Sequence, residues 1–401
     1  MSGPLAGVRI VDITTVVMGP FATQILGDLG AEIVKIETPD GDNVRHVGPM
    51  RNPGMGHMFL HLNRNKKSMV LDLKQPAGRE ALLRLAKQAD VLIYNVRPQA
   101  MARLKLGYDD VAAVNPRIIY VGAYGFAQDG PYAAKPAYDD LIQGMVGLPW
   151  LMRQSGASEP RFVPATISDR IVGLHAVYAV TAALYHRERT GRGQSVEVPM
   201  FESMAQLILG DHFGGRTFEP PLGPAGYSRV LAPHRKPFAT RDGYLCLLIY
   251  NDKQWQNFFR LIGREAMYRD DPRFSSHTNR AHHIAEVNEF VAEQIKTRTT
   301  AEWLRALAEA DIPVTTMNSI DDLMDDPHFA ATGFIRHMEH PSEGALKTTA
   351  VPTRWSDSPP QFQRHAPRLG EHSIELLRAT GHSESEISAM LADGVTRVPE
   401  D

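Results

Sequence analysis

Cysteine is nearly absent from this chain, since Cys246 is the only one among 401 residues. One cysteine cannot form an internal disulfide framework or a thiolate-rich metal site, and it fits the reducing environment of the cytoplasm. An excess of one charge is also missing, because 43 basic and 46 acidic side chains leave a formal net charge of −3. The chain therefore lacks the basic surface of a nucleic-acid-binding protein, and an anionic ligand would need a local cluster of cations.

Long hydrophobic runs are absent as well. Residues 1–9 show no charged segment followed by an apolar one, so we expect no signal peptide. The most apolar stretch follows Asp169 and is interrupted by histidine and tyrosine side chains between His175 and His186. We therefore predict that no segment reaches the length of a membrane span, and we expect a cytoplasmic protein with neither membrane nor nucleic-acid partners.

The usual dinucleotide and metal signatures are missing too. Residues 14–20 follow the first predicted strand, and neither G-x-G-x-x-G nor G-x-x-x-x-G-K-[ST] occurs there, which argues against nicotinamide or P-loop chemistry. His57 and His61 have a spacing that can hold zinc on a helix. No glutamate follows His57 and no third ligand is apparent, so we expect no metal site.

Strands alternate with helices in the first half of the chain. The predicted strands cover residues 7–14, 32–37, 68–73, 91–94, 117–122 and 195–198, and the predicted helices include 21–29 and 78–88. Such alternation predicts a mostly parallel sheet with helices on both faces. We therefore predict an α/β fold with a Rossmann-like large domain.

The composition changes near residues 210–237, where glycine and proline crowd a segment with little periodicity. Beyond it we predict strands at 243–250, 312–317, 334–338 and 346–350, helices at 254–262, 280–296 and 301–310, and two terminal helices. A chain of this length favours two domains. We assign 1–210 to the first part of the large domain, 211–237 to a linker or active-site loop, 238–325 to a smaller α+β domain, and 326–401 to a segment that completes the large domain.

Asp169 stands near the start of a long apolar helix that ends at the glycines of residues 189–194. Apolar residues recur with nearly helical spacing at Ile171, Leu174, Val177, Val180, Ala183 and Leu184. Ser168 is the predicted N-cap. A carboxylate in a first helical turn is favoured by the helix dipole, so we expect Asp169 to be ionised at neutral pH, which suits a nucleophile. Such an acid more often only caps its helix, so the surrounding sequence must decide whether Asp169 is catalytic.

Cations in the first half gather where predicted strands end or helices begin. They are Lys35, Arg64, Lys66, Lys67, Lys74, Arg97, Arg103 and Lys105. Parallel sheets bind ligands at the carboxyl ends of their strands, so these side chains could together bind a phosphorylated ligand.

Several ordered motifs make the chain resemble the class III CoA-transferases, a group that includes carnitine–CoA transferases, formyl-CoA:oxalate transferases and α-methylacyl-CoA racemases. The motifs are PLAGVRIVD (4–12), GP (19–20), GDLGAEIVKIE (27–37), NRNKKS (63–68), YNVRP (94–98), DGP (129–131), YD (138–139), TGRGQSVEV (190–198) and LGEH (369–372). The match runs nearly end to end. It implies an interlocked homodimer that acts on CoA thioesters and small carboxylic acids, with coenzyme A as substrate and no metal or nicotinamide.

The resemblance also implies residue roles. Asp169 would attack an acyl-CoA thioester, giving an aspartyl anhydride and then an aspartyl-CoA thioester. The positions that correspond to CoA-binding ones are Asn95, Arg97, Arg103, Lys135, Leu71 and Lys74, with the last two near the adenine, and Val16 and Met18 near the pantetheine. Tyr138 precedes Asp139, which stands where the family places an acid near the nucleophile.

The departures from the family pattern concern the substrate. Thr15 and Val17 replace the His and Gln of oxalate-handling members, Thr38 replaces an Arg of some members, and the glycine run of formyl-CoA transferases is missing around Gly243. Formyl-CoA and oxalate are therefore not the expected substrates. We predict succinyl-CoA as donor and a short dicarboxylate- or sulfinate-like acceptor.

Arg235, between His234 and Lys236, could hold the distal acidic group of such an acceptor, although a solvated loop charge is an equally good interpretation. Two alternatives remain. A racemase of this fold would carry a histidine where this chain has Tyr138, which is a poor base at neutral pH. A non-catalytic CoA-binding protein would not need Asp169.

Overall fold

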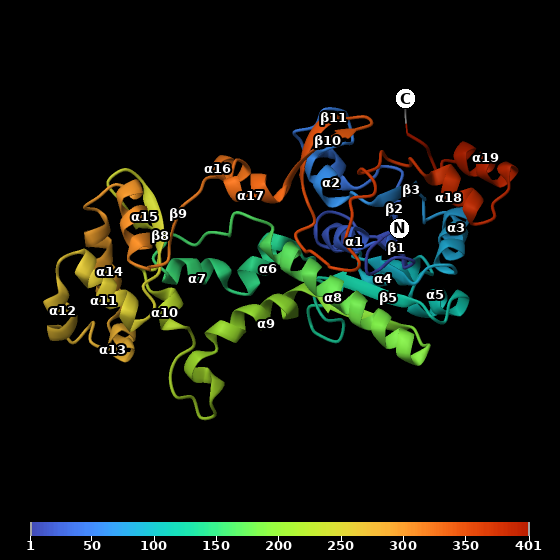
Figure 1. Cartoon of the computed structure of the whole chain (residues 1–401). Helices are drawn as coiled ribbons and strands as arrows, with labels where there is room; N and C mark the ends of the chain where they lie inside the picture. Colours follow the sequence, from blue (N-terminus) through green and yellow to red (C-terminus); the bar gives the residue numbers. More distant parts are fainter. Residues whose placement is uncertain (1, 400–401) are drawn as a thin grey trace. The chain divides into compact units, whose positions relative to one another are not determined.

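The computed structural model describes residues 2–399 (Figure 1). Contacts divide the chain into two compact units. The first unit contains Met1–Val146, Val163–Leu207 and His328–Asp401, and the second contains Gly147–Phe162 and Ile208–Pro327. Residues 147–162 and the whole glycine- and proline-rich segment 211–237 therefore belong to the second unit.

A six-stranded parallel sheet forms the centre of the first unit. Its strands are β1 Arg9–Ile13, β2 Glu32–Glu37, β3 Lys66–Val70, β4 Val91–Tyr94, β5 Ile119–Tyr124 and β6 Gln194–Pro199. They lie in the order β3-β2-β1-β4-β5-β6, and every neighbouring pair is parallel. The predicted α/β class and parallel sheet are confirmed. The order reverses direction between β1 and β4, and such a switch point is where sheets of this kind bind ligands.

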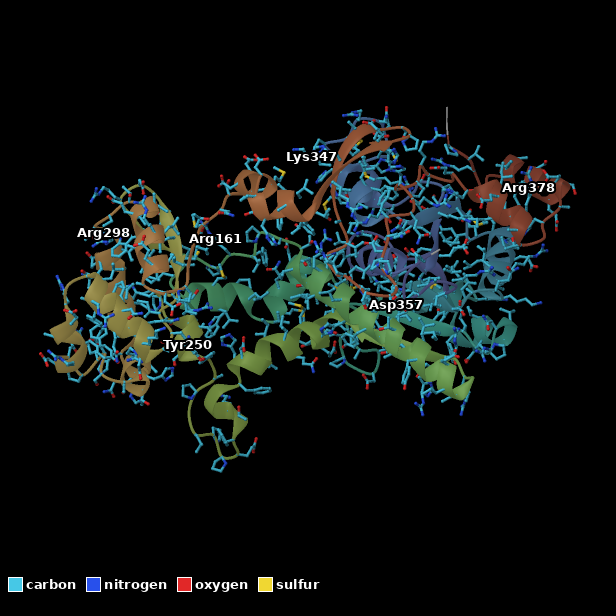
Figure 2. The ribbon with its side chains drawn as sticks, viewed as in Figure 1. Arg161, Tyr250, Arg298, Lys347, Asp357 and Arg378 are labelled. Atoms are coloured by element: carbon cyan, nitrogen blue, oxygen red, sulfur yellow. The ribbon has the colours of Figure 1, made fainter. Side chains whose placement is uncertain are left out.

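Helices and one hairpin accompany this sheet. They are α1 Met18–Asp28, η1 Asn43–His46, α2 His57–Leu62, α3 Pro76–Ala86, α4 Pro98–Arg103, α5 Tyr108–Val114, α6 Asp139–Met145, α8 Ile167–Thr190, α9 Met200–His212, α17 Pro327–Thr332, β10 Ile335–His340, β11 Gly344–Thr349, α18 Ser373–Ala379 and α19 Glu384–Ala392. The strands β10 and β11 pair in antiparallel fashion. Charged side chains such as Lys347 of β11 and Arg378 of α18 are exposed (Figure 2).

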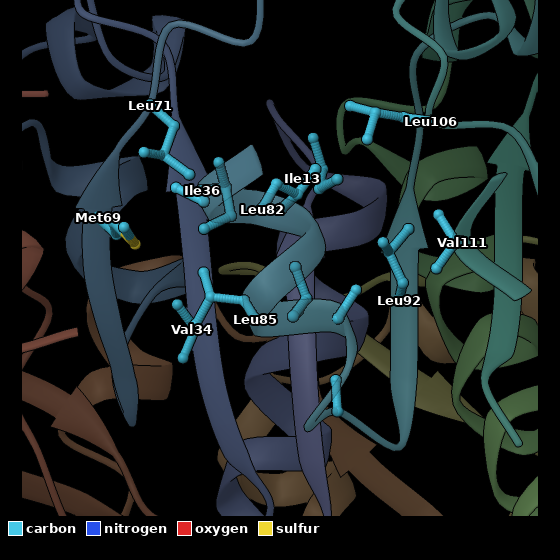
Figure 3. Close-up of a cluster of buried hydrophobic side chains, with 14 of the residues drawn as sticks. Ile13, Val34, Ile36, Met69, Leu71, Leu82, Leu85, Leu92, Leu106 and Val111 are labelled. Atoms are coloured by element: carbon cyan, nitrogen blue, oxygen red, sulfur yellow. The ribbon is translucent and has the colours of Figure 1, made fainter. Parts of the chain in front are cut away.

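The core of the first unit lies between the sheet and the helices on one of its faces. Leu82 and Leu85 of α3 pack in one cluster with Val34 and Ile36 of β2, and with Met69 of β3 (Figure 3). Helices α18 and α19 contribute Leu376, Leu377, Ile387 and Met390 to the same cluster. The C-terminal residues therefore belong to the core that the first strands form. Strands so rich in Val and Ile fit a sheet that is buried on both faces.

Helix α8 begins differently from the prediction. Its N-cap residue is Thr166 rather than Ser168, and within residues 2–399 the Thr166 side chain makes no capping hydrogen bond. The predicted apolar stripe is buried only in part, because Val180 and Ala183 are buried but Leu174 is 51% exposed. The buried positions are Ser168, Val172, Gly173, Ala176, Val180, Ala183 and Arg187. The predicted glycine stop is confirmed, since Gly191 has a φ of 73° and donates its N–H to the Arg187 carbonyl.

By length and composition alone, α8 could cross a membrane, and it is the one helix of this kind among the described residues. The prediction that no segment reaches that length is therefore wrong, because the uncharged His and Tyr side chains do not interrupt the helix. A core helix of a globular protein meets the same criteria, and a third of the apolar window is buried. Residues of α8 pack against α1, α6 and β5.

The second unit combines a small antiparallel sheet with helices. The strands β7 Phe238–Ala239, β8 Tyr244–Leu247 and β9 Val314–Thr316 lie in that order. Its helices are α7 Leu148–Gln154, η2 Gly214–Thr217, α10 Ser228–Leu231, α11 Asp252–Leu261, α12 Glu265–Asp270, α13 His277–His282, α14 Ile284–Ile295, α15 Thr300–Glu309 and α16 Ile320–Met324. The single helix predicted over 280–296 is interrupted at His283.

Aromatic side chains fill the core of the second unit. Trp255, Phe258 and Phe259 of α11 pack with Phe274 and with Trp303 of α15 in one buried cluster. Capping boxes define the starts of both helices: Asn251 with Gln254, and Thr299 with Glu302. The apolar faces of these helices thus meet over the short sheet.

Candidate active site

The loop after β1 stands at the switch point of the parallel sheet, and several hydrogen bonds hold its backbone. Asn95, directly after β4, accepts the Thr15 N–H at 3.0 Å and donates its Nδ2 to the Thr15 carbonyl at 2.7 Å. Val16 has a φ of 69°, which is unfavourable for a β-branched residue. Its N–H donates to Asp42 Oδ1 at 3.0 Å. The loop is therefore held in one strained conformation at the carboxyl ends of β1 and β4.

Buried ion pairs lie next to this loop and hydrogen-bond to it. Lys35 Nζ donates to the Thr14 carbonyl at 2.7 Å and to Asp42 Oδ2 at 2.9 Å. Lys66 Nζ lies 3.1 Å from Asp12 Oδ2. Burial would raise the pKa of Asp12, but Lys66 and Lys35 together hold that pKa below its ordinary value. Each acid of this network thus has a cation beside it.

The same contacts correct part of the predicted cationic cluster. Lys35 and Lys66 are fully buried in their ion pairs, and Arg64 NH2 lies 2.7 Å from Asp28 Oδ2. These three cations neutralise acids of the fold and are not available to a phosphorylated ligand. The prediction was wrong for them because sequence position alone does not reveal a buried partner.

The carboxylate of Asp169 belongs to a second cluster, in which α8 meets α6. The Asp169 N–H donates to Asp139 Oδ1 at 2.9 Å, and the Ser168 hydroxyl donates to the Asp139 carbonyl at 3.4 Å. Asp139 is buried and Asp169 is partly exposed. The Asp139 side chain therefore supplies the cap that Thr166 and Ser168 do not provide for α8.

The ionisation of Asp169 differs from the prediction. Burial, and then the neighbouring Asp139, raise the pKa of Asp169 to about 7, while Arg170 opposes the shift. With a pKa of about 7, Asp169 is ionised in only about half of the protein molecules near neutral pH. The expectation of a fully ionised Asp169 is not supported, because burial disfavours its charge and the Asp139 carboxylate of α6, which caps the first turn of α8, adds to this effect.

Helix α1 brings the loop close to the start of α8. A Cβ on Gly173 would lie 2.9 Å from the Met18 carbonyl oxygen, so only glycine allows this approach. The Arg170 guanidinium lies 4.6 Å from the centre of the Phe21 ring. Gly173 stands one helical turn after Asp169, so both residues lie on the side of α8 at which Gly173 meets the beginning of α1.

The residues expected to bind CoA follow three strands of the sheet. Leu71 and Lys74 come after β3, Asn95, Arg97 and Arg103 come after β4, and Lys135, Tyr138 and Asp139 come after β5. The carboxyl ends of parallel strands lie at one edge of a sheet, so the topology brings these segments together. Leu71 is buried, whereas Lys74, Arg97, Arg103 and Lys135 are exposed. Of the loop, Thr15 and Val16 are partly exposed, but Val17 and Met18 are buried.

A sequence model of CoA-transferase family III matches residues 5–373.

The chain belongs to CoA-transferase family III.

Relatives of known function support this assignment along the whole chain. It is 31% identical to the succinyl-CoA:glutarate CoA-transferase of Mus musculus, over 98% of this chain and 90% of that protein. It is 32% identical to the formyl-CoA:oxalate CoA-transferase of Streptomyces avermitilis, over 98% of this chain and all of that one. A solved structure of a CAIB/BAIF family protein from Brucella suis matches with a TM-score of 0.80 and 28% identity, over 95% of this chain and 100% of that chain. This class III CoA-transferase therefore has acyl-CoA as a substrate.

One residue of the cluster around Asp169 was missed by the sequence analysis. Gln143 of α6 is fully buried and donates its Nε2 to Asp139 Oδ2 at 2.6 Å. The signal was present in the sequence, because residues four apart on a helix face each other and a glutamine follows Asp139 at that spacing. It could not be recognised without knowing that Asp139 begins a helix.

Arg235 lies in the second unit. Together with Arg229, His234 and Lys236 it lines a cavity of about 150 Å³ whose apolar wall includes Phe238, Leu247, Ile249 and Trp255. Within the described part of the chain, no carboxylate lines this cavity.

The histidine pair considered for zinc occurs on α2. Between residues 2 and 399 no group of three or more His, Cys, Asp or Glu side chains has the arrangement of a metal site. His57 and His61 instead line a cavity of about 130 Å³ with His340 and His365. A larger cavity of about 1330 Å³ lies in the first unit around the hairpin β10–β11 and residues 350–362, and Asp169 is not among its lining residues.

Proposed function

We propose that this CoA-transferase moves CoA from succinyl-CoA to a short dicarboxylate- or sulfinate-like acid, with Asp169 as the nucleophile. The observation that supports this most is the position of Asp169 in the first turns of α8, partly exposed and opposite the strained loop at the switch point. The name of the mouse relative, which pairs succinyl-CoA with glutarate, motivates the choice of acids.

The chemistry begins with the ionised carboxylate of Asp169. One of its oxygens attacks the thioester carbonyl, the carbon–sulfur bond breaks, and CoA thiolate leaves behind an aspartyl–acyl anhydride. The thiolate then attacks the aspartyl carbonyl, which releases the donor acid as a carboxylate and forms an aspartyl-CoA thioester. The acceptor carboxylate reacts in the reverse sequence, and Asp169 returns as a free carboxylate.

The charge around Asp169 suits this cycle. Both covalent intermediates are uncharged at the aspartyl oxygen, so the neighbouring Asp139 destabilises the free anion relative to them. A carboxylate with a pKa near 7 is also a stronger nucleophile than an ordinary aspartate. The proposed mechanism therefore gains from the same carboxylate that reduces the ionised fraction at neutral pH.

The CoA part of the substrate would lie along the edge of the sheet. We propose that Lys74, Arg97, Arg103 and Lys135 provide its phosphate contacts, because they are exposed cations at the carboxyl ends of β3, β4 and β5. Leu71 and Asn95, with Val16, Met18, Tyr138 and Asp139, would shape the rest of the path. Thr15 and Val17 belong to the loop that would face the acyl group.

A matrix of acyl-CoA donors against free acids, read by mass spectrometry, tests the proposed function. We expect the highest rate for succinyl-CoA with a short dicarboxylate or a sulfinate, and no transfer by Asp169→Asn. A racemase would transfer nothing in this matrix but would exchange the α-hydrogen of a branched acyl-CoA. A CoA-binding protein without activity would do neither.

The cavity of the second unit gives the proposed specificity of the acceptor. Four basic side chains above an apolar wall suit a short acid whose second anionic group needs a partner. Arg235→Ala should raise the KM of a dicarboxylate about tenfold and change that of a monocarboxylate less than twofold. Arg305→Ala, on the exposed side of α15 in the same unit, is the matched control. Equal effects of Arg235→Ala on both acids would exclude this role.

The assembly and the location complete the proposal. We propose an interlocked homodimer, two domains with the boundaries given by the sequence analysis, and a cytoplasmic enzyme. Light scattering of the purified protein measures the oligomeric state, and a mass of one chain in dilute solution would contradict it.

A further inference from the structure

Gln143 holds three polar groups at once, and their chemistry fixes the orientation of its amide. Its Oε1 accepts the Val163 N–H at 2.9 Å, and its Nε2 donates to Asp139 Oδ2 at 2.6 Å and to the Ala165 carbonyl at 3.4 Å. The backbone N–H can only donate, and the carboxylate and the carbonyl can only accept. The amide therefore links α6 to the segment that leads into α8, and it can do so in one orientation only.

This link determines where the second oxygen of Asp139 points. With Oδ2 held by Gln143, Oδ1 accepts the Asp169 N–H at 2.9 Å. Among residues 2–399, the Thr166 side chain makes no capping hydrogen bond, so Asp139 is the side chain that caps α8. The position of the Asp169 backbone thus depends on the carboxylate that Gln143 orients.

The charged groups around Asp169 are few. Asp139 faces it from α6, and Arg170 follows it on α8. Burial, and then the charges of neighbouring side chains that include Arg170, lower the pKa of His61 of α2. Helix α1 presents the uncharged Met18 and Phe21 at this end. The orientation of one carboxylate can therefore control both the place and the ionisation of Asp169.

We propose that Gln143 is a positioning residue of the transfer reaction, which orients Asp139 so that this carboxylate fixes the start of α8 and the nucleophile Asp169. The inference rests on the proposed function, because it assigns Gln143 a role in the reactivity of Asp169. Gln143 touches neither substrate nor the reacting atoms in this role.

An exchange of the two side chains tests the link. Gln143→Glu places two carboxylates against each other. Asp139→Asn offers one acceptor oxygen where two are needed, so its NH2 group faces either Gln143 Nε2 or the Asp169 N–H. Each variant should therefore lower kcat roughly 10- to 100-fold. The double variant Asp139→Asn/Gln143→Glu restores a donor on residue 139, an acceptor on residue 143 and the acceptor for the Asp169 N–H. It loses only the long 3.4 Å hydrogen bond from residue 143 to the Ala165 carbonyl. Its kcat should recover to within about tenfold of the wild type.

The pH dependence separates positioning from a merely structural effect. In Asp139→Asn the negative charge beside Asp169 is lost, and in the double variant it moves to residue 143, so the acidic limb of kcat/KM should shift to lower pH by roughly one unit. Gln24→Leu removes a different buried glutamine, on α1, and should leave the limb unchanged. A structural defect alone would lower the activity of the variants and keep the limb in place.

Three results would overturn the inference: a kcat of Gln143→Glu within twofold of the wild type, a double variant no better than the product of the single losses, or unchanged limbs in both Asp139 variants. If the wild type transfers no CoA between any acids, the proposed function fails instead. Labelling of Asp169 by a water-soluble carbodiimide against pH, mapped by mass spectrometry, then still measures its ionisation in each variant. An unchanged midpoint in Asp139→Asn would refute the effect of the Asp139 carboxylate on Asp169, which the role of Gln143 requires.

Discussion

Two groups of carboxylates in the first unit have neighbours of opposite charge. Below the loop after β1, Asp12, Glu37 and Asp42 each lie within 3.1 Å of a lysine or arginine. Burial would raise the pKa of Glu37, but the partner Arg45 lowers this pKa to about 2. At the start of α8, Asp169 faces another acid, Asp139, and its pKa rises to about 7.

The difference separates charges that hold the fold from a charge that is available for chemistry. A paired carboxylate is stabilised as an anion and gains little from forming a bond. Asp169 is destabilised as an anion, so the proposed acylation would relieve an unfavourable interaction. We infer that the ion pairs make the loop rigid, while the unpaired acid at the start of α8 supplies the reactivity.

Removing the unpaired acid should have the largest effect on activity. Asp169→Asn keeps the size and the helix but removes the nucleophile, so transfer should fall by about 10³-fold or more. Asp140→Asn, which changes an exposed acid in the first turn of α6, serves as the control and should stay near wild-type activity. Steady-state assays of both variants check this, and an Asp169→Asn enzyme with a tenth of the normal rate would refute covalent catalysis by this residue.

Breaking a paired acid should instead lower stability. Lys66→Met leaves Asp12 buried without its closest cation, and we expect a loss of about 3–5 kcal/mol in the free energy of unfolding. The neighbouring Lys67 pairs with Glu32, which is partly exposed, and with Glu375, which is exposed, so Lys67→Met should cost only about 0–1 kcal/mol. Urea denaturation measures both, and equal losses would mean that burial of the pair is irrelevant.

The dependence of stability on pH gives a third contrast. The pKa of Asp169 is higher in the folded state than in the unfolded chain, so its folded form keeps a proton between about pH 4 and 7 and loses stability as the pH rises through this window. Asp169→Asn removes this penalty. It should stabilise the protein at pH 8 by on the order of 2 kcal/mol, half the value for a fully buried group because Asp169 is partly exposed. Thermal unfolding at pH 4 and 8 tests this, and a gain that is no greater at pH 8 would contradict the raised pKa.

The smallest effect is expected in the loop itself. Asn95→Leu removes two hydrogen bonds to Thr15, so the strained backbone should loosen and the KM for acyl-CoA should rise about five- to tenfold. Asn115 also donates to two backbone carbonyls, those of Ala86 and Ala89, but lies outside the site. Asn115→Leu should therefore reduce stability without changing KM. An equal KM for acyl-CoA in both variants would show that the loop has no role in CoA binding.

The sequence allowed the parallel sheet to be predicted because its strands are short Val- and Ile-rich runs between helices, and β2 and β4 have the predicted bounds. The sequence did not allow the buried face of α8 to be predicted. That helix has apolar residues on several sides, so the buried stripe depends on packing against α1 rather than on periodicity.

The site was predictable in part. The family motifs identify Asp169 and the segments after β3, β4 and β5, but the partners of buried cations come from distant strands. Lys66 meets Asp12 across 54 residues, for example. The raised pKa of Asp169 also needs the fold, because Asp139 lies 30 residues earlier in the chain.

Chemical trapping of the covalent intermediate tests the central claim most directly. The enzyme is incubated with succinyl-CoA, treated with hydroxylamine or borohydride, and mapped by peptide mass spectrometry. We predict a hydroxamate or a reduced side chain at Asp169, and none at Asp139, Asp12 or Asp42. A modification at another acid, or none at any residue while CoA transfer proceeds, would contradict the assignment of Asp169 as the reactive carboxylate.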